Sequence, residues 1–354
     1  MNLSVLRMGK ILENYFKEHY NSEDKFVVKD IQSLAKGWQT DLFSFTLIRE
    51  GNNEKNIDHL ILRMYPGKKL AISTKHEFEV LQALFESGYP VPKTYILELN
   101  EEVLGHSFII MERIVGEDMG EKFTQILEQN DQKAMTKEIL PQFVHLFVQL
   151  HELNWKILAN KTKYTEKENP YFFIDRSLNK LEKQILDYKI TELLPLLNWL
   201  KENRNKASLE KIVIVHSDFH PHNIVLDVSG KGFVIDWPGA YIGDYREDLG
   251  WTLMLMEAYT SREVTDAFLQ SYEKLSGKRL VEINYFIILS ICYRLFEVTV
   301  TIKLGSEGLG LREEAVEQIK ETSYHIRNLL VFLKEKIGLS IPETEKMIDE
   351  LEHR

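Results

Sequence analysis

The stretch that decides the fold is Val215-His216-Ser217-Asp218-Phe219-His220-Pro221-His222-Asn223-Ile224-Val225-Leu226-Asp227. An apolar run over 212–215 leads into it, and a second β-branched run turns at 229–232 and ends in Ile235-Asp236-Trp237. Two short buried strands should therefore deliver Asp218 and Asn223, and then Asp236, to one edge. A divalent metal and a phosphate-transfer site need this set of acids and an amide.

Phosphoryl transfer from a nucleotide sets three requirements. Oxygen ligands must hold Mg²⁺, backbone amides must cradle the phosphates, and a carboxylate must accept the proton of the attacking hydroxyl. Asp218 and Asn223 are five residues apart and can lie at the two ends of one loop, and Asp236 follows 13 residues after Asn223. An acid placed as a base, followed by Asn and Asp as hard oxygen ligands, is the arrangement that kinases use.

These motifs resemble those of the aminoglycoside phosphotransferase and choline kinase-like family of small-molecule kinases. The matching residues are His216 to Asn223 and Ile235-Asp236-Trp237, and the resemblance covers roughly residues 25–260. It implies that Asp218 is the catalytic base and that Asn223 and Asp236 bind Mg²⁺. It also implies that ATP or GTP donates the phosphate.

The resemblance assigns supporting roles around this loop. His216 would brace the loop, and Asp248, in Gly243-Asp244-Tyr245-Arg246-Glu247-Asp248-Leu249, would steady it by hydrogen bonds. Glycine is common in the family at the position of Ser217. Serine can follow the same backbone path unless that path needs a positive φ.

The remaining pattern predicts an α+β, two-lobed protein-kinase-like fold. The N-terminal part should be a β-rich sheet with one inserted helix: strands at 26–30, 42–48, 59–65, 95–97 and 108–111, and a helix at 74–86. Helical patterns dominate afterwards, at 121–154, 178–206, 245–275, 280–304 and 312–338 and from near Pro342. We therefore predict a nucleotide-binding lobe over 1–112 and a catalytic and substrate-binding lobe over 113–354.

In the N-terminal lobe, the resemblance suggests where the phosphates bind. Gly37 and Thr40 lie in a loop between two predicted strands, where kinases cover the ATP phosphates. Arg63 stands where the family expects a strand lysine; it keeps the charge but has a different geometry. Glu77 would pair with Arg63. The simpler alternatives are an ordinary hairpin turn and a surface arginine.

The strand at 108–111 matches the one that leads into the hinge between kinase lobes. There the backbone of Glu112 and Ile114 would hydrogen-bond the adenine edge, with Met111 beside it. An edge strand with one buried face explains the apolar residues equally well.

The acceptor should be a small-molecule hydroxyl compound bound by the helical lobe. Aromatic rings and acids can together hold an ammonium group, so a cationic acceptor such as an aminoglycoside would fit. The same aromatic residues could instead pack the core. The candidates by position are Trp237, Tyr241, Trp251, Glu257, Tyr293, Phe296 and Glu297.

Composition and charge exclude several other classes. The net charge of −10 argues against a nucleic-acid partner. We find no long uncharged apolar stretch and no signal-peptide pattern, so we expect a cytoplasmic protein without a membrane partner, as a monomer or homodimer. Cys292 is the single cysteine and should be a buried structural thiol.

Two readings from other classes stay open. One is a catalytically silent, kinase-like module that binds a nucleotide or metabolite. The other is a metal-dependent hydrolase that binds zinc or iron through His216, His220 and His222. In the kinase interpretation, His220 and His222 have the weakest claim to a function.

Overall fold

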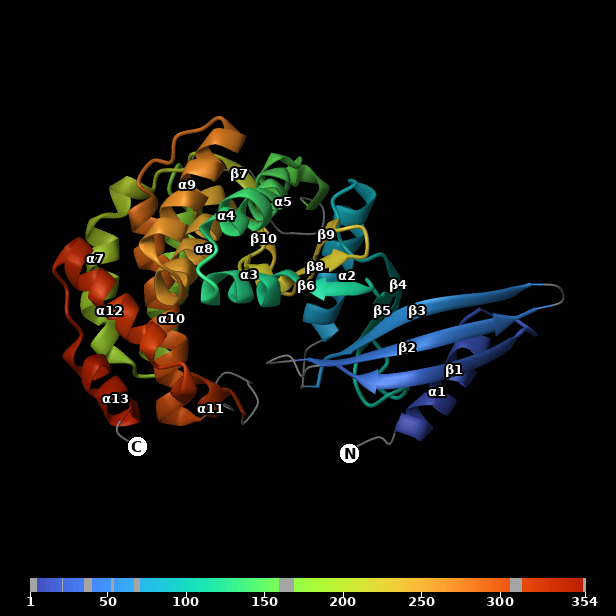
Figure 1. Cartoon of the computed structure of the whole chain (residues 1–354). Helices are drawn as coiled ribbons and strands as arrows, with labels where there is room; N and C mark the ends of the chain where they lie inside the picture. Colours follow the sequence, from blue (N-terminus) through green and yellow to red (C-terminus); the bar gives the residue numbers. More distant parts are fainter. Residues whose placement is uncertain are drawn as a thin grey trace. The chain divides into compact units, whose positions relative to one another are not determined.

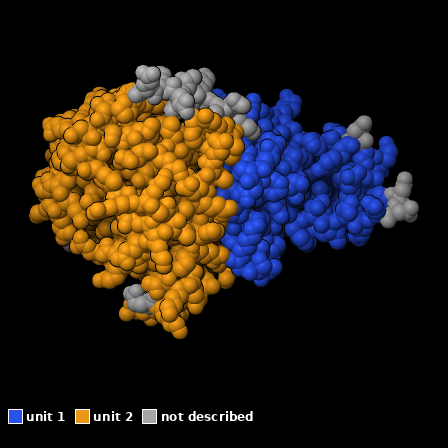
Figure 2. Space-filling view, turned by 90° about the horizontal axis from the view of Figure 1, so that it is seen from above, with its two compact units in different colours: residues 1–116, 227–238 blue, residues 117–226, 239–354 orange. Residues whose placement is uncertain are grey.

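The computed structural model describes residues 5–20, 22–34, 40–51, 54–66, 71–158, 169–305 and 314–352. It divides the chain into two compact units (Figures 1 and 2). Unit 1 is formed by 1–116 and 227–238, and unit 2 by 117–226 and 239–354. The sequence prediction placed the boundary after 112 and gave 227–238 to the C-terminal lobe. The structure instead joins this hairpin segment to the N-terminal unit.

Unit 1 is built on one antiparallel sheet whose strand order is β1-β2-β3-β5-β4. Its elements are α1 (Val5–His19), β1 (Lys25–Ser33), β2 (Asp41–Glu50), β3 (Lys55–Met64), α2 (Ala71–Glu86), β4 (Thr94–Glu98), β5 (Phe108–Glu112) and the short β9 (Gly232–Val234). All five predicted strands and the predicted helix are present, each longer than its sequence pattern indicated. The β-rich N-terminal fold is therefore confirmed.

The alternation of β3 decides which of its side chains are available for function. Leu60, Leu62 and Met64 are buried in one apolar cluster with Leu12 and Phe16 of α1. Successive strand side chains point to opposite faces of a sheet. The residues between these three, Arg63 among them, therefore point to the face away from α1.

Unit 2 is mostly helical. Its helices are α3 (Met119–Glu128), α4 (Gln132–Ala134), α5 (Leu140–Glu152), α6 (Phe172–Asp187), α7 (Leu194–Glu202), α8 (Tyr245–Tyr259), α9 (Arg262–Ser276), α10 (Ile283–Leu304), α11 (Glu314–Glu321), α12 (Tyr324–Ile337) and α13 (Pro342–Glu352). A π-helical turn, Met135–Ile139, joins α4 to α5. The strands are β6 (Gly116–Asp118), β7 (Ile212–Val215), β8 (Ile224–Asp227) and β10 (Tyr241–Asp244). Antiparallel pairing of β7 with β10 sets Val215 opposite Tyr241.

Helix α10 bears on the expectation that the chain has no long uncharged apolar stretch. It is 22 residues long with a hydropathy of 1.6, and by length and composition it is the one described helix that could cross a membrane. In the structure 78% of that apolar window is buried. A helix that is apolar on all sides and surrounded by protein is a core helix.

Candidate active site

The loop that carries Asp218 starts where β7 ends. All four β7 residues are Ile or Val, and Val213 to Val215 are fully buried. The chain leaves the strand at His216, forms a short 3₁₀ turn at Pro221–Asn223 and continues into β8. Pairing of β7 with β10 thus fixes the point from which the loop projects.

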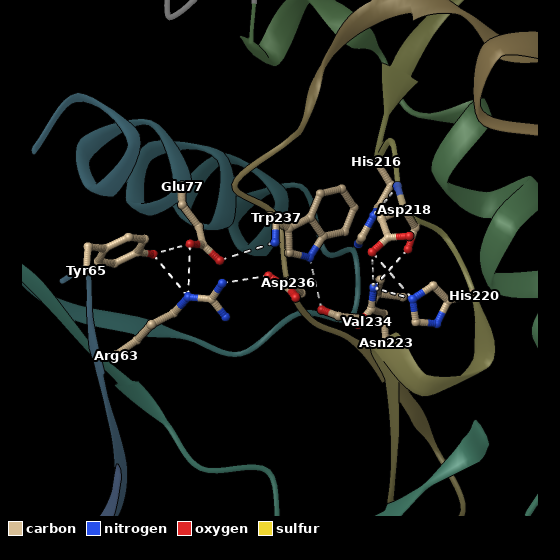
Figure 3. Close-up of polar contacts among 10 residues, drawn as sticks. All are labelled: Arg63, Tyr65, Glu77, His216, Asp218, His220, Asn223, Val234, Asp236 and Trp237. Atoms are coloured by element: carbon tan, nitrogen blue, oxygen red, sulfur yellow. Dashed lines mark hydrogen bonds and ion pairs between the residues drawn. The ribbon is translucent and has the colours of Figure 1, made fainter. Parts of the chain in front are cut away.

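Asp218 is held from several sides within unit 2 (Figure 3). Its Oδ1 accepts a hydrogen bond from the indole Nε1 of Trp251 at 2.7 Å, and its Oδ2 lies 3.4 Å from Nε2 of His220. Its amide donates to Nδ1 of His216 at 3.2 Å, as expected for a bracing residue. The Asp218 side chain nevertheless stays 47% exposed. It is therefore both oriented and accessible.

The environment of Asp218 favours its charged form. Desolvation raises the pKa of this carboxyl. The neighbouring His220 and His216 and the hydrogen bond from Trp251 outweigh desolvation and lower the pKa to about 2. Asp218 is therefore a carboxylate at neutral pH and can accept a hydrogen bond from a hydroxyl.

Asn223 is fixed by its amide nitrogen. Nδ2 donates to the carbonyl of Asp218 at 2.8 Å and lies 3.2 Å from Nε2 of His220. The residue is 8% exposed. Because the nitrogen is engaged in this way, the oxygen is the atom that Asn223 can offer to a cation.

The backbone at Ser217 differs from the expectation. Its φ is +74°, in the left-handed region that favours glycine. Because the backbone at this position has a positive φ, serine is not equivalent to glycine here. A Cβ on Gly239 would lie 2.2 Å from Ser217 Oγ, so Gly239 leaves room for the serine hydroxyl.

In unit 1, the expected pair of Arg63 and Glu77 is present. Nε of Arg63 lies 3.2 Å from Oε2 of Glu77, and both side chains are almost fully buried. Nη2 of Arg63 lies 2.6 Å from Oδ1 of Asp236, which has a positive φ of 69°. The Tyr65 hydroxyl donates to Glu77 (Figure 3). Arg63 thus links β3, α2 and the turn that carries Asp236.

The charges of this group depend on one another. Burial raises the pKa of Glu77, and the guanidinium of Arg63 opposes that effect. Burial would lower the pKa of Arg63, but Glu77 and Asp236 raise it above its ordinary value. Arg63 therefore remains a cation in the interior. The Asp236 side chain is 40% exposed, so a carboxylate oxygen stays accessible beside the arginine.

Trp237 and Tyr241 are held by contacts within the fold. Trp237 is fully buried, and its Nε1 donates to the carbonyl of Val234 at 3.0 Å. The Tyr241 hydroxyl donates to Oε2 of Glu247 at 3.1 Å. Arg176 lies 4.9 Å from the centre of the Tyr241 ring.

The residues predicted to bind the nucleotide differ in how well their positions in the structure fit that role. Gly37 lies outside the described residues, and Thr40 is buried immediately before β2. Met111 and Glu112 end β5, and Ile114 follows the strand. The amide of Glu112 already donates to the carbonyl of Lys93 at 2.8 Å. Glu112 could therefore meet an adenine edge only as an acceptor.

Three residues contribute more than the sequence indicated. His220, with little expected role, touches both Asp218 and Asn223. Trp251 bonds the carboxylate of Asp218 itself. Its place three residues after Asp248 on a helix was a usable signal, because such residues share one face. His222 lies 3.1 Å from Asp118 and occupies the space beside Gly120 that a side chain would need.

The histidines do not form one metal site. His216 is buried under the loop, His220 contacts Asp218, and His222 pairs with Asp118. Across the part of the chain that the structure describes, no group of three or more His, Cys, Asp or Glu side chains is arranged to hold a metal ion. This geometry weighs against the zinc or iron alternative.

Comparisons with known proteins identify the family of the chain. The sequence profile described as "Phosphotransferase enzyme family" matches residues 30–282, more than half of the chain. Human acyl-CoA dehydrogenase family member 11 is 28% identical over 204 residues, which are 55% of this chain and 25% of that protein. The chain thus spans about a quarter of that relative's length.

Solved structures share the fold. A putative aminoglycoside phosphotransferase from Ralstonia eutropha superposes with a TM-score of 0.64 at 17% identity, over 90% of this chain and 96% of that one. The ethanolamine kinase of Plasmodium vivax superposes with a TM-score of 0.58 at 15% identity, over 89% and 84%. The two-lobed protein-kinase-like fold is confirmed. Because the family profile covers more than half of the chain, the chain belongs to the phosphotransferase enzyme family.

Proposed function

We propose that this enzyme moves the γ-phosphate of ATP or GTP to a hydroxyl of a small molecule, with Asp218 as the base. The observation that carries the proposal is the state of Asp218: it is ionised, oriented by Trp251 and His220, and still half exposed. A carboxylate in this condition can accept the hydrogen bond of an acceptor hydroxyl and take its proton during transfer.

Asn223 and Asp236 fit a magnesium ion by their chemistry. Both offer hard oxygen atoms, the amide oxygen of Asn223 and a carboxylate oxygen of Asp236. The two residues would hold Mg²⁺, which neutralises charge on the phosphates when it is bound. Arg63 keeps Asp236 in place, and His220 and Asp218 keep the Asn223 amide in place.

The nucleotide would be held by residues of unit 1. Gly37 and Thr40, which the sequence assigns to the phosphates, would contact them, and Arg63, braced by Glu77, would supply positive charge to them. Arginine can fork onto two phosphate oxygens, so it can take the place of lysine here. The end of β5 would receive the base through the carbonyl of Glu112 and the amide of Ile114, beside Met111.

The acceptor would be a hydroxyl compound that also carries an ammonium group. Glu297 on α10 supports this class. Its pKa is raised, first by desolvation and, against the effect of Arg294, by the negative charge of Asp218. A nearby cation favours the charged form of such a carboxyl, so an ammonium group of the acceptor can pair with Glu297. An aminoglycoside or a choline-like amino alcohol has this combination of groups.

A screen of nucleotide consumption tests the proposal. The acceptors would be aminoglycosides, macrolides, choline, homoserine, sugars and methylthioribose, each with Mg²⁺ and either ATP or GTP. We expect turnover that is lost in Asp218→Ala and Asp236→Ala and kept in Asp266→Asn, an exposed carboxylate of α9. Full turnover by either alanine variant would contradict the proposal. Mg²⁺-dependent nucleotide binding without transfer to any acceptor would instead indicate a silent binding module.

A further inference from the structure

One face of α8 contacts four successive residues of the loop that carries Asp218. Asp248 accepts the amides of His216 and Ser217 at 2.8 and 2.9 Å. Trp251 donates to the carboxylate of Asp218 at 2.7 Å. The hydroxyl of Thr252 donates to the carbonyl of Phe219 at 2.7 Å. These three contacting residues stand at i, i+3 and i+4 and therefore share a helix face.

Trp251 differs from the other two in what it contacts. Asp248 and Thr252 are buried and bind the loop backbone. Trp251 is partly exposed and binds the side chain to which the proton chemistry is assigned. A hydrogen bond to a charged acceptor is stronger than one between neutral groups. The indole N–H is a donor only and does not titrate, so it cannot compete for the proton of an acceptor.

The two oxygens of Asp218 are held unequally. Oδ1 has the 2.7 Å bond from Trp251. Among the described residues, Oδ2 contacts Nε2 of His220 and Nδ2 of Asn223, both at 3.4 Å. A contact of 3.4 Å is near the long limit of a hydrogen bond, so these contacts fix the position of Oδ2 less tightly than the 2.7 Å bond fixes Oδ1. Oδ2 is therefore the oxygen with capacity for a new, short hydrogen bond.

We propose that Trp251 is a positioning residue: its indole N–H fixes Oδ1 of Asp218 and so presents Oδ2 to the acceptor hydroxyl. This inference rests on the proposed function. In the step, the acceptor oxygen forms a bond to the γ-phosphorus while the bond from that phosphorus to the β–γ bridging oxygen breaks. The hydroxyl proton passes to Oδ2, and the nucleoside diphosphate leaves with the electron pair of the broken bond.

The test is Trp251→Phe, which keeps an aromatic ring and removes the donor. Trp199→Phe is the matched control, because Trp199 lies on α7 and stacks on Tyr285. We expect kcat of Trp251→Phe to fall roughly 10- to 100-fold, as misorientation of a reacting group does. The KM for the nucleotide should be unchanged, since the nucleotide is assigned to other residues. An unchanged kcat, or an equal loss in Trp199→Phe, would overturn the inference.

A spectroscopic experiment tests the contact between Trp251 and Asp218 independently of enzyme activity. The indole N–H resonance that disappears in Trp251→Phe is assigned to Trp251 in ¹H–¹⁵N spectra of the full chain. It should move upfield in Asp218→Ala, which removes the acceptor, while the other indole resonances stay in place. A resonance that does not move would contradict the contact. If the wild type shows no turnover with any acceptor, the proposed function and the role of Trp251 in catalysis are both contradicted. The shift of the Trp251 indole resonance in Asp218→Ala would in that case still show that Trp251 contacts Asp218.

Discussion

The hydroxyl of Ser217 occupies the space that a side chain on Gly239 would need: a Cβ built there lies 2.2 Å from Ser217 Oγ. Ser217 itself has φ +74°. A serine in a glycine-like conformation and a glycine opposite it therefore form a closely packed pair next to Asp218. Two predictions concern this pair.

Ser217→Gly should stabilise the protein. The left-handed conformation costs a residue with a Cβ about 1–2 kcal/mol, which glycine avoids. Glycine also makes the unfolded chain more flexible, and this opposing effect lowers the gain in stability by about 0.5–1 kcal/mol. We expect a net gain of about 0.5 kcal/mol in urea unfolding at unchanged m-value. Ser208→Gly is the control, because Ser208 has φ −58° and should gain nothing. Destabilisation by Ser217→Gly would contradict the strain.

Gly239→Ala should destabilise the protein by about 1–3 kcal/mol, the usual cost of overpacking. In the Ser217→Gly background the opposing hydroxyl is gone, so the same substitution should cost clearly less. The double-mutant cycle in urea measures this coupling. Equal costs in the two backgrounds would show that the close approach does not matter for stability.

Arg63→Met should be strongly destabilising. It leaves Glu77, whose side chain is 1% exposed, without its cation. Breaking a buried pair on one side costs about 3–5 kcal/mol. Adding Glu77→Gln should recover part of the loss, because the unpaired charge is then absent. Arg49→Met is the control, since Arg49 and Asp24 pair at 2.6 Å with both side chains partly exposed; it should cost about 1 kcal/mol or less. Similar losses in Arg49→Met and Arg63→Met would refute the buried network.

His325 should make stability depend on pH. Burial, followed by the neighbouring Arg294, lowers the pKa of His325 to about 4. The unfolded chain, with an ordinary histidine pKa of about 6.5, binds this proton first as the pH falls. Stability from this residue is therefore complete above about pH 6.5 and is lost towards pH 4, with a slope of at most about 1.4 kcal/mol per pH unit.

His325→Gln should flatten the dependence of unfolding free energy on pH over that range. His145→Gln, which changes an exposed histidine of α5, should leave it as in the wild type. Thermal or urea unfolding between pH 7 and pH 4 distinguishes them. An unchanged pH dependence in His325→Gln would exclude this residue as the cause.

Local patterns predicted much of the fold and the centre of the site. The alternating segment 42–48 lies within β2, the predicted strand at 59–65 overlaps β3 as far as Met64, and Arg63 pairs with Glu77 as expected. What the sequence missed depends on distant parts of the chain. The bond from Trp251 to Asp218 spans 33 residues, and the positive φ of Ser217 shows only in the folded backbone. Residues 227–238 join unit 1 through contacts such as Val234 with Pro90.

The central claim is that Asp218 performs the proton chemistry of phosphate transfer. The direct measurement is the rate of γ-phosphate transfer by Asp218→Asn relative to the wild type, with the best acceptor from the screen and saturating Mg²⁺–nucleotide. We predict a loss of about 10²- to 10⁴-fold with nucleotide binding retained, the usual contribution of a general base. A transfer rate close to that of the wild type would contradict the account.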